Sequence, residues 1–305
     1  MKNLSNRMSK FLILFAVTAV AALLYAPLVL ATPILGPELS SFTVLGATTV
    51  TNVPTSTIVG NVGVSPGTAI TGFNSVSGTA TADSQVTGGL VHSNTAVAQL
   101  AQAQLTDAIN YLGSLGPGTT LSLPDLAGLT LAPGVYTVNA GTTNLSGTLT
   151  LDGGGNANAA WVFQMPSTLI TSPNSVVNVI NTGSGAGVYW NVGSSATIDV
   201  NTTFMGNILA LTSISMNTSA TDLCGRALAS TGAVTLQMNS LSGVCTGILA
   251  GSDGLSGGLD VTIGPGGGPI VTPLPPASVP EPSTMLLLGS GLAGLAALRK
   301  RFKKA

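Results

Sequence analysis

The 305-residue chain has very few charged residues, because lysine, arginine, aspartate and glutamate together make up only 6% of it. Between residues 32 and 278 the only basic residue is Arg226. The same segment contains nine acidic residues, which gives it a formal net charge of −8. A nucleic-acid-binding surface needs clustered lysine or arginine, so this composition excludes nucleic acid as a partner.

Residues that carry catalysis and bind metals are also scarce. The chain has one histidine, His92, and its acidic residues are scattered singly. We find no metal-binding spacing of cysteine and histidine, no nucleophile motif near His92 and no phosphate-binding loop. We therefore expect a protein that is not an enzyme and that uses no metal and no cofactor. His92 is expected to be a solvated or capping residue near the start of a helix.

Aromatic residues make up only 4% of the chain, yet the composition does not indicate disorder, because valine, isoleucine and leucine are plentiful. Threonine and serine alternate with apolar residues in short runs such as 212–216 and 232–236, which is typical of strands. The sequence IVGNVGV at 58–64 has two echoes, at 204–210 and 223–229, which lie 19 residues apart. A period near twenty with strands inside each unit predicts a β-solenoid.

One segment departs from this pattern. Within residues 92–112, apolar residues recur at three- and four-residue spacing, with alanine and glutamine between them. This periodicity predicts an amphipathic helix, which the glycines at 113 and 116 terminate. We expect the helix to cover one flank of the solenoid.

The first 31 residues are predicted to be a signal peptide. Basic residues precede a long apolar run over 11–30, and small residues favour cleavage after Ala31. An uncleaved membrane anchor is the alternative, because the apolar run is long for a signal. The solenoid domain is expected to cover residues 32–251, and the Gly/Pro-rich segment 252–278 is predicted to be a linker.

The C-terminal tail, residues 279–305, resembles the PEP-CTERM sorting signal of Gram-negative bacteria. It begins with a short motif, Pro280, Glu281 and Pro282. An apolar segment follows at residues 285–298, and the tail ends in basic residues over 299–304. The resemblance implies processing by an exosortase and export to the cell surface or extracellular matrix, with transient anchorage in the membrane by this tail as a transmembrane segment. The apolar part is shorter than the ~20 residues of a usual membrane helix. An ordinary tail anchor is the alternative.

The two cysteines, Cys224 and Cys245, are 21 residues apart, which is about one coil of the predicted solenoid. Because neighbouring strands lie ~4.8 Å apart, the two residues can come within disulfide distance. An even number of cysteines in an exported chain favours a disulfide. The alternative is a pair of free, buried thiols.

Several motifs follow one another in an order that resembles the microbial ice-binding protein family, over roughly residues 41–247. They are SPGTA at 65–69, AQLAQA at 98–103, LAPGVY at 131–136, GTLTL at 147–151, VGSSAT at 192–197, FMGNILA at 204–210 and GRALA at 225–229. The resemblance implies an all-β fold with one long helix, namely a three-faced, discontinuous β-solenoid flanked by an α-helix. In such a fold N-terminal strands insert among C-terminal coils.

The resemblance also implies an ice crystal surface as the partner, and threonine-rich strands supply candidate faces. Because β-branched threonine is restricted at χ1, rows of it hold hydroxyl and methyl groups in fixed positions. The candidate ice-binding face consists of Thr55, Thr57, Asn201, Thr203, Thr218, Ser219 and Thr221. An alternative face consists of Thr148, Thr150, Ser195, Thr197, Ser213, Ser215 and Thr235.

Residues 218–221 resemble a Thr-(Ala/Gly)-X-(Thr/Asn) motif found on some ice-binding faces of the family, although Ser219 stands where alanine or glycine is expected. A second function fits the same scaffold: a non-enzymatic structural or adhesive protein of the cell surface or exopolysaccharide matrix. A regular, flat threonine face favours ice binding. An irregular face, or one on which Asp199 or Asp222 protrudes, favours the matrix protein.

Overall fold

The computed structural model describes residues 32–138, 141–263 and 269–276. The predicted signal peptide and the predicted sorting tail, with its proposed transmembrane segment, lie outside the described residues. Within the described part of the chain, no helix is long and apolar enough to cross a membrane.

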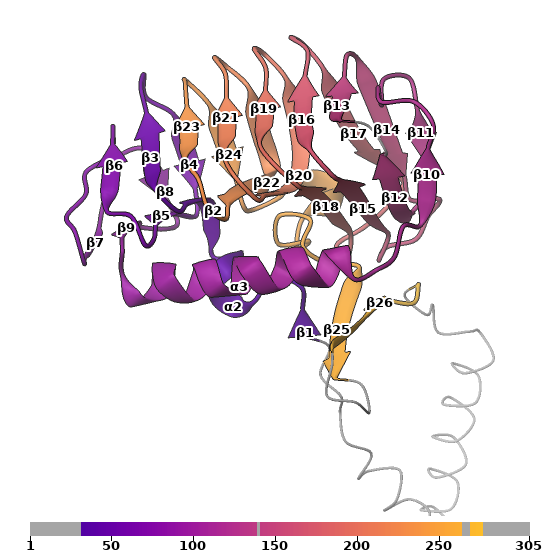
Figure 1. Ribbon diagram of the computed structural model, residues 1–305, viewed down its shortest axis with the longest axis horizontal. Coiled ribbons are helices and arrows are strands. Elements are labelled where there is room, and N and C mark those ends of the chain that lie inside the picture. The colour runs from indigo at the N-terminus through magenta and orange to yellow at the C-terminus, as the bar shows by residue number, and fades with distance from the viewer. Residues whose placement is uncertain (1–31, 139–140, 264–268, 277–305) are drawn as a thin grey trace, which may run out of the picture. The chain divides into compact units, whose positions relative to one another are not determined.

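The chain winds into a solenoid in which successive strands turn corners and stack in parallel on equivalent strands of neighbouring coils (Figure 1). Strands stacked in this way form three faces. The first, called the seven-stranded face, contains in spatial order β13 (Thr142–Leu145), β16 (Thr168–Thr171), β19 (Ala196–Ile198), β21 (Ile214–Met216), β23 (Val234–Leu236), β3 (Thr49–Asn52) and β6 (Ala69–Thr71).

The other two faces share long strands that bend around a corner. The helix-covered face contains β10 (Thr119–Leu121), β12 (Gly134–Val138), β15 (Ala160–Met165), β18 (Gly187–Val192), the later parts of β20 (Thr203–Ala210) and β22 (Thr221–Ala229), β2 (Phe42–Gly46), β5 (Asn61–Val64), β9 (Val91–Ser93) and β7 (Ala80–Thr81). The third face contains β11 (Thr130–Leu131), β14 (Thr148–Asp152), β17 (Val176–Ile180), the first residues of β20 and β22, β24 (Ser240–Ser242), β4 (Thr57–Val59) and β8 (Val86–Thr87).

The order of coils in space differs from their order in sequence, as the resemblance implied. Strand β22 pairs with β2, β23 pairs with β3, and β24 pairs with β4, so the N-terminal coils stack beyond the C-terminal ones. The echoed motif marks one corner of the coil. Gly60 and Gly206 have φ angles of +114° and +109°, a backbone conformation that side chains disfavour.

Helix α3 (Ala96–Gly113) lies along the helix-covered face, close to the predicted 92–112. Thr95 is its N-cap and accepts a hydrogen bond from the amide of Ala98. The prediction that His92 is solvated is wrong, because it lies buried in β9, with Nδ1 3.0 Å from the Thr95 hydroxyl. Burial lowers the pKa of His92. Thr95, and not His92, caps the helix, and the contact between the two side chains helps to hold Thr95 in place.

Two hydrophobic clusters hold the domain together, one inside the solenoid and one beneath α3. Alternation along each strand of the helix-covered face supplies both. On β15, Phe163 points inward and stacks on Trp190 with ring centroids 4.2 Å apart, whereas Val162 faces the helix. The helix contributes a stripe of small and aliphatic residues, namely Ala98, Ala101, Leu105, Ala108 and Leu112.

The segment predicted to be a linker, 252–278, instead contains two strands. β25 (Leu259–Ile263) and β26 (Pro269–Pro273) pair in antiparallel fashion, and Leu259, Val261 and Val271 join the hydrophobic cluster beneath α3. Glycine and proline dominated the composition, but alternate apolar residues decide the structure here. The remaining elements are β1 (Thr32–Pro33), α2 (Pro37–Ser40) and η1 (Gly247–Leu249).

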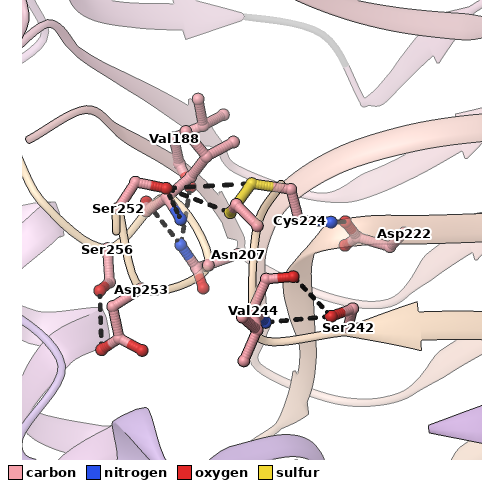
Figure 2. The surroundings of a disulfide bond; sticks show 12 residues. Val188, Asn207, Asp222, Cys224, Ser242, Val244, Ser252, Asp253 and Ser256 are labelled. Atoms are coloured by element: carbon pink, nitrogen blue, oxygen red, sulfur yellow. Dashed lines mark hydrogen bonds between the residues drawn. A yellow bond between two sulfur atoms is a disulfide. The ribbon is translucent and has the colours of Figure 1, made fainter. Parts of the chain in front are cut away.

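The predicted disulfide between Cys224 and Cys245 is present and buried, with the two Cα atoms 4.7 Å apart (Figure 2). Ser252 lies against it, with Oγ 3.1 Å from the sulfur of Cys245. The amide of Leu255 donates a 3.3 Å hydrogen bond to the same hydroxyl. The disulfide therefore fixes the third face against the loop that precedes β25.

Arg226, the only basic residue of the domain, is fully buried where three segments meet. Its Nε and Nη2 donate to the carbonyl of Ser40 at 3.1 and 2.6 Å. Nη1 donates to Oδ1 of Asn207 at 2.9 Å and to the carbonyl of Asp253 at 2.8 Å, and Nη2 lies 3.2 Å from the Asp253 carboxylate. One side chain thus joins the N-terminal segment, a central coil and the C-terminal loop.

Candidate functional site

The outer surface of the seven-stranded face presents two parallel rows of side chains, most of them threonine or serine, and Ile170, which is 41% exposed, is the large apolar member. Successive strands pair in one continuous register, so equivalent residues lie side by side. The first row is Thr142, Thr168, Ser195, Ser213, Ala233, Thr49 and Ala69. The second row is Asn144, Ile170, Thr197, Ser215, Thr235, Thr51 and Thr71.

This surface is regular and uncharged. None of the six strand pairings of the sheet has a register shift, and the residues between the two rows, such as Ile214 and Val234, are buried in the core. Strands ~4.8 Å apart therefore repeat the same outward pattern along the whole face. In the first row, Thr168 donates to Thr142, and the hydroxyls of Ser195 and Ser213 accept from the amides of Ser213 and Ala233. In the second row, no protein hydrogen bond among the described residues uses the hydroxyls of Thr197, Ser215 or Thr235, which leaves them to water.

The third face holds the central residues of the candidate set. Thr203 pairs with Thr221, Thr221 with Ser240, and Ser240 with Thr57, so the structure brings the three predicted threonines into one row. Ser240 was missed, since the glycine after its strand, Gly243, is followed by Val244 and not by the asparagine or arginine of the echoed motif. The row continues through Val176 to Thr148 at the other end.

The third face is less regular than the seven-stranded face. The register of β20 and β22 shifts between Phe204 and Gly206, and β17 pairs with β20 at a single position. Leu223, next to the shift, is 54% exposed. Asn178 on β17, whose side chain is longer than that of serine or threonine, is also exposed. Larger side chains therefore lie beside the hydroxyl row, and Val176 interrupts it.

The other four residues of the candidate set lie at the corner between these two faces. Asn201 and Ser219 adopt positive φ angles of +56° and +62°, which places them in turns. Thr218 donates to Oε1 of Gln237 at 3.3 Å, and Thr55 is exposed before β4 begins. These side chains do not extend the strand row.

The alternative set was predicted to form one face, and this is wrong for two of its members. Thr148 and Thr150 belong to β14 on the third face, whereas Ser195, Thr197, Ser213, Ser215 and Thr235 lie on the seven-stranded face. The strict alternation of 148–151 shows that a strand is present but not on which side of a corner it lies.

Sequence reasoning missed the N-terminal and early-coil members of the seven-stranded face, namely Thr49, Thr51, Thr71, Thr142 and Thr168. A signal for part of this set was available. Residues 68–71 read Thr-Ala-Ile-Thr, which matches the Thr-(Ala/Gly)-X-(Thr/Asn) motif without the departure found at 218–221.

Neither carboxylate that could disturb a flat face stands out from a strand. Asp222 points inward and is fully buried, and its Oδ1 accepts a hydrogen bond from the Cys224 amide at 3.4 Å. Its Oδ2 has no partner, and burial raises the pKa of Asp222 to about 8. Asp199 is half-buried after β19, where it accepts 2.8 Å hydrogen bonds from Val200 and Asn217.

A groove of about 630 Å³ lies between the end of α3 and the corner that leads to the seven-stranded face. Its lining includes Asn110, Thr137, Gln164 and Asn191 and no charged residue. Among the described residues, no three histidine, cysteine, aspartate or glutamate side chains gather as metal ligands would.

Comparisons with known proteins show which proteins the chain resembles. A family model described as Ice-binding-like matches residues 44–242, and a PEP-CTERM protein-sorting motif matches residues 278–301. The chain is 42% identical to an ice-binding protein of Nostoc sp. (strain HG1), over 87% of this chain and 86% of that protein. It matches the crystal structure of an ice binding protein from an Antarctic biological consortium with a TM-score of 0.60 and 35% identity, over 69% of this chain and 91% of that one. The structure of the Shewanella frigidimarina ice-binding protein_1 DUF3494 domain matches with a TM-score of 0.60 and 28% identity, over 70% of this chain and 97% of that one.

Proposed function

We propose, because this chain belongs to the ice-binding-like family, that it is an exported protein that adsorbs to ice through the outer surface of its seven-stranded face. The observation that carries the choice of face is its unbroken register across all seven strands. A crystal lattice is periodic, so a surface that adsorbs to it must hold its groups at a constant spacing.

The chemistry of the two rows supports adsorption to ice. Threonine presents a methyl and a hydroxyl whose positions are restricted by the β-branch. The hydroxyls of Thr197, Ser215 and Thr235 are free of protein partners and can hold water molecules in place. Because the face carries no charged side chain, no ion hydration shell competes with that ordered water.

The third face is the weaker candidate on the same criteria. Its hydroxyl row includes Thr203 and Thr221, but a register shift and the exposed Leu223 lie beside it. The exposed Leu223 lies beside that shift, whereas the exposed Ile170 of the seven-stranded face lies in a sheet without a register shift.

The PEP-CTERM motif suggests export and membrane-anchored sorting. We propose that an exosortase-type enzyme processes the tail and that the domain reaches the surface or matrix of a Gram-negative cell. An exopolysaccharide partner remains part of the alternative matrix function, and no feature of the described residues specifically favours it.

The test compares two matched substitutions, Thr235→Glu on the seven-stranded face and Thr203→Glu on the third face. Thermal hysteresis and inhibition of ice recrystallisation should be abolished by Thr235→Glu and retained by Thr203→Glu. Both side chains point outward, so each change should alter the free energy of unfolding by only about 0.5 kcal/mol.

Circular dichroism and a denaturant titration check that both variants are folded. The reverse pattern of activities would assign ice binding to the third face. An inactive wild-type protein would contradict ice binding itself and favour the structural or adhesive function.

A further inference from the structure

We infer that, before its tail is processed, the chain is tethered to the membrane with the seven-stranded face of its domain turned away from the bilayer. The identification of this face with ice binding rests on the proposed function. The orientation itself depends only on where the chain leaves the fold.

The direction of winding defines three corners. Strand β18 crosses the helix-covered face and is followed by β19 on the seven-stranded face, and the chain then returns along the third face into β20. Strands of the helix-covered face therefore begin at its corner with the third face and end at its corner with the seven-stranded face. The beginnings of β15 and β18 mark the corner opposite the seven-stranded face.

The C-terminal segment is fastened at that opposite corner. The amide of Gly257 donates to the carbonyl of Ala186, just before β18, at 3.1 Å. The amide of Leu274 donates to the carbonyl of Gly258 at 2.8 Å. Asn158, just before β15, donates to the carbonyl of Pro275 at 2.7 Å. Figure 1 shows β25 and β26 on the side of α3, with the seven strands along the opposite edge.

The length of the tether limits how far the domain can turn. Only eight residues lie between residue 276 and the start of the apolar segment at 285, and this connection spans at most about 32 Å when fully extended. A strand of six residues crosses one face over about 20 Å. To lay the seven-stranded face on the membrane, the tether would have to cross a whole neighbouring face, over the side chains that project from it. That path takes up most of the length of the tether.

Electrostatic attraction to the membrane does not oppose the orientation that the tether sets. Arg226 is the only basic residue among the described residues, and it is buried, so no face offers lysine or arginine to anionic lipid. The domain carries nine acidic residues, which such lipid repels. The point of attachment therefore decides the orientation.

The experiment measures the distance of two positions from the bilayer. The full exported chain, with its tail, is purified from a Gram-negative host that lacks an exosortase and is reconstituted into vesicles that contain spin-labelled lipid. A fluorophore is attached through Ser184→Cys at the tether corner or through Thr197→Cys on the seven-stranded face. Both native cysteines are bonded to each other, so the new thiol alone is labelled.

We expect several-fold stronger quenching at position 184 than at position 197. Equal quenching, or stronger quenching at 197, would overturn the orientation, and so would a chain that fails to float with the vesicles. Ice adsorption of the unlabelled chain in detergent is measured separately. Loss of that activity would contradict the proposed function, whereas the quenching comparison decides the orientation in either case.

Discussion

Replacing Arg226 with alanine should destabilise the domain more than any single change on its surface. The guanidinium is fully buried and serves acceptors on three separate segments, namely Ser40, Asn207 and Asp253. Arg226→Ala leaves the carbonyls of Ser40, Asp253 and Gly254 and the Asn207 amide oxygen without this donor. These segments belong to the N-terminal insertion, a central coil and the C-terminal loop, so their contacts should weaken together.

The magnitude follows from the burial of each partner. An unsatisfied buried acceptor costs about 1–3 kcal/mol, and water that enters the vacated space recovers part of this. The side chain of Asp253 is 61% exposed, so its carboxylate regains solvent and the ion pair itself contributes less than about 1 kcal/mol. We therefore expect Arg226→Ala to lower the free energy of unfolding by about 3–5 kcal/mol, mostly from the buried acceptors that lose their donor.

Urea unfolding followed by tryptophan fluorescence measures this loss, because Trp161 and Trp190 are both fully buried. Asp253→Asn is the matched control. It removes the carboxylate charge but retains the arginine and its carbonyl partners, and should cost less than about 1 kcal/mol. A loss below about 1 kcal/mol for Arg226→Ala, or equal losses for the two variants, would refute the reasoning.

Three further predictions concern buried groups. Replacing both Cys224 and Cys245 with serine should lower the free energy of unfolding by about 3 kcal/mol, because the disulfide closes a loop with a sequence separation of 21; an unchanged urea midpoint would argue against this. Burial raises the folded-state pKa of Asp222 from 3.8 to about 8, so the stability that its protonated form provides is complete below about pH 4 and is lost as the pH rises to 8. Asp222→Asn should remove this dependence, whose slope is at most about 1.4 kcal/mol per pH unit, and should be more stable than wild type at pH 9; parallel stability–pH curves for the two proteins would contradict the burial argument. Thr143 is buried on β13 and its hydroxyl has no hydrogen-bond partner, so Thr143→Val should stabilise the domain by about 1 kcal/mol in the same titration, and a destabilised variant would indicate an unseen partner.

Local patterns predicted much of the architecture. The echo at 204–210 and 223–229 predicted stacked coils, and these residues do pair in β20 and β22. Three- and four-residue spacing predicted α3 to within a few residues, because a helix repeats on that scale. The separation of Cys224 from Cys245 matched one coil, which is the condition for their disulfide. Each of these properties depends on neighbours close in sequence or on a fixed repeat.

Tertiary structure alone decided which residues share a face. Alternation predicts that Thr148 and Thr197 both point outward. It does not predict that β14 and β19 lie on different faces, because the corners between them depend on backbone angles and on strands stacked from distant coils. Alternation after the outward Thr221 points Asp222 inward, but only its pairing with the neighbouring coil at Phe204 and the packing around it show that it is fully buried. Strands β25 and β26 form because each supplies the other's hydrogen bonds and because Val271 finds the cluster beneath α3. The sequence by itself therefore determined the kind of surface this protein presents, whereas packing between distant coils decided which threonines form it.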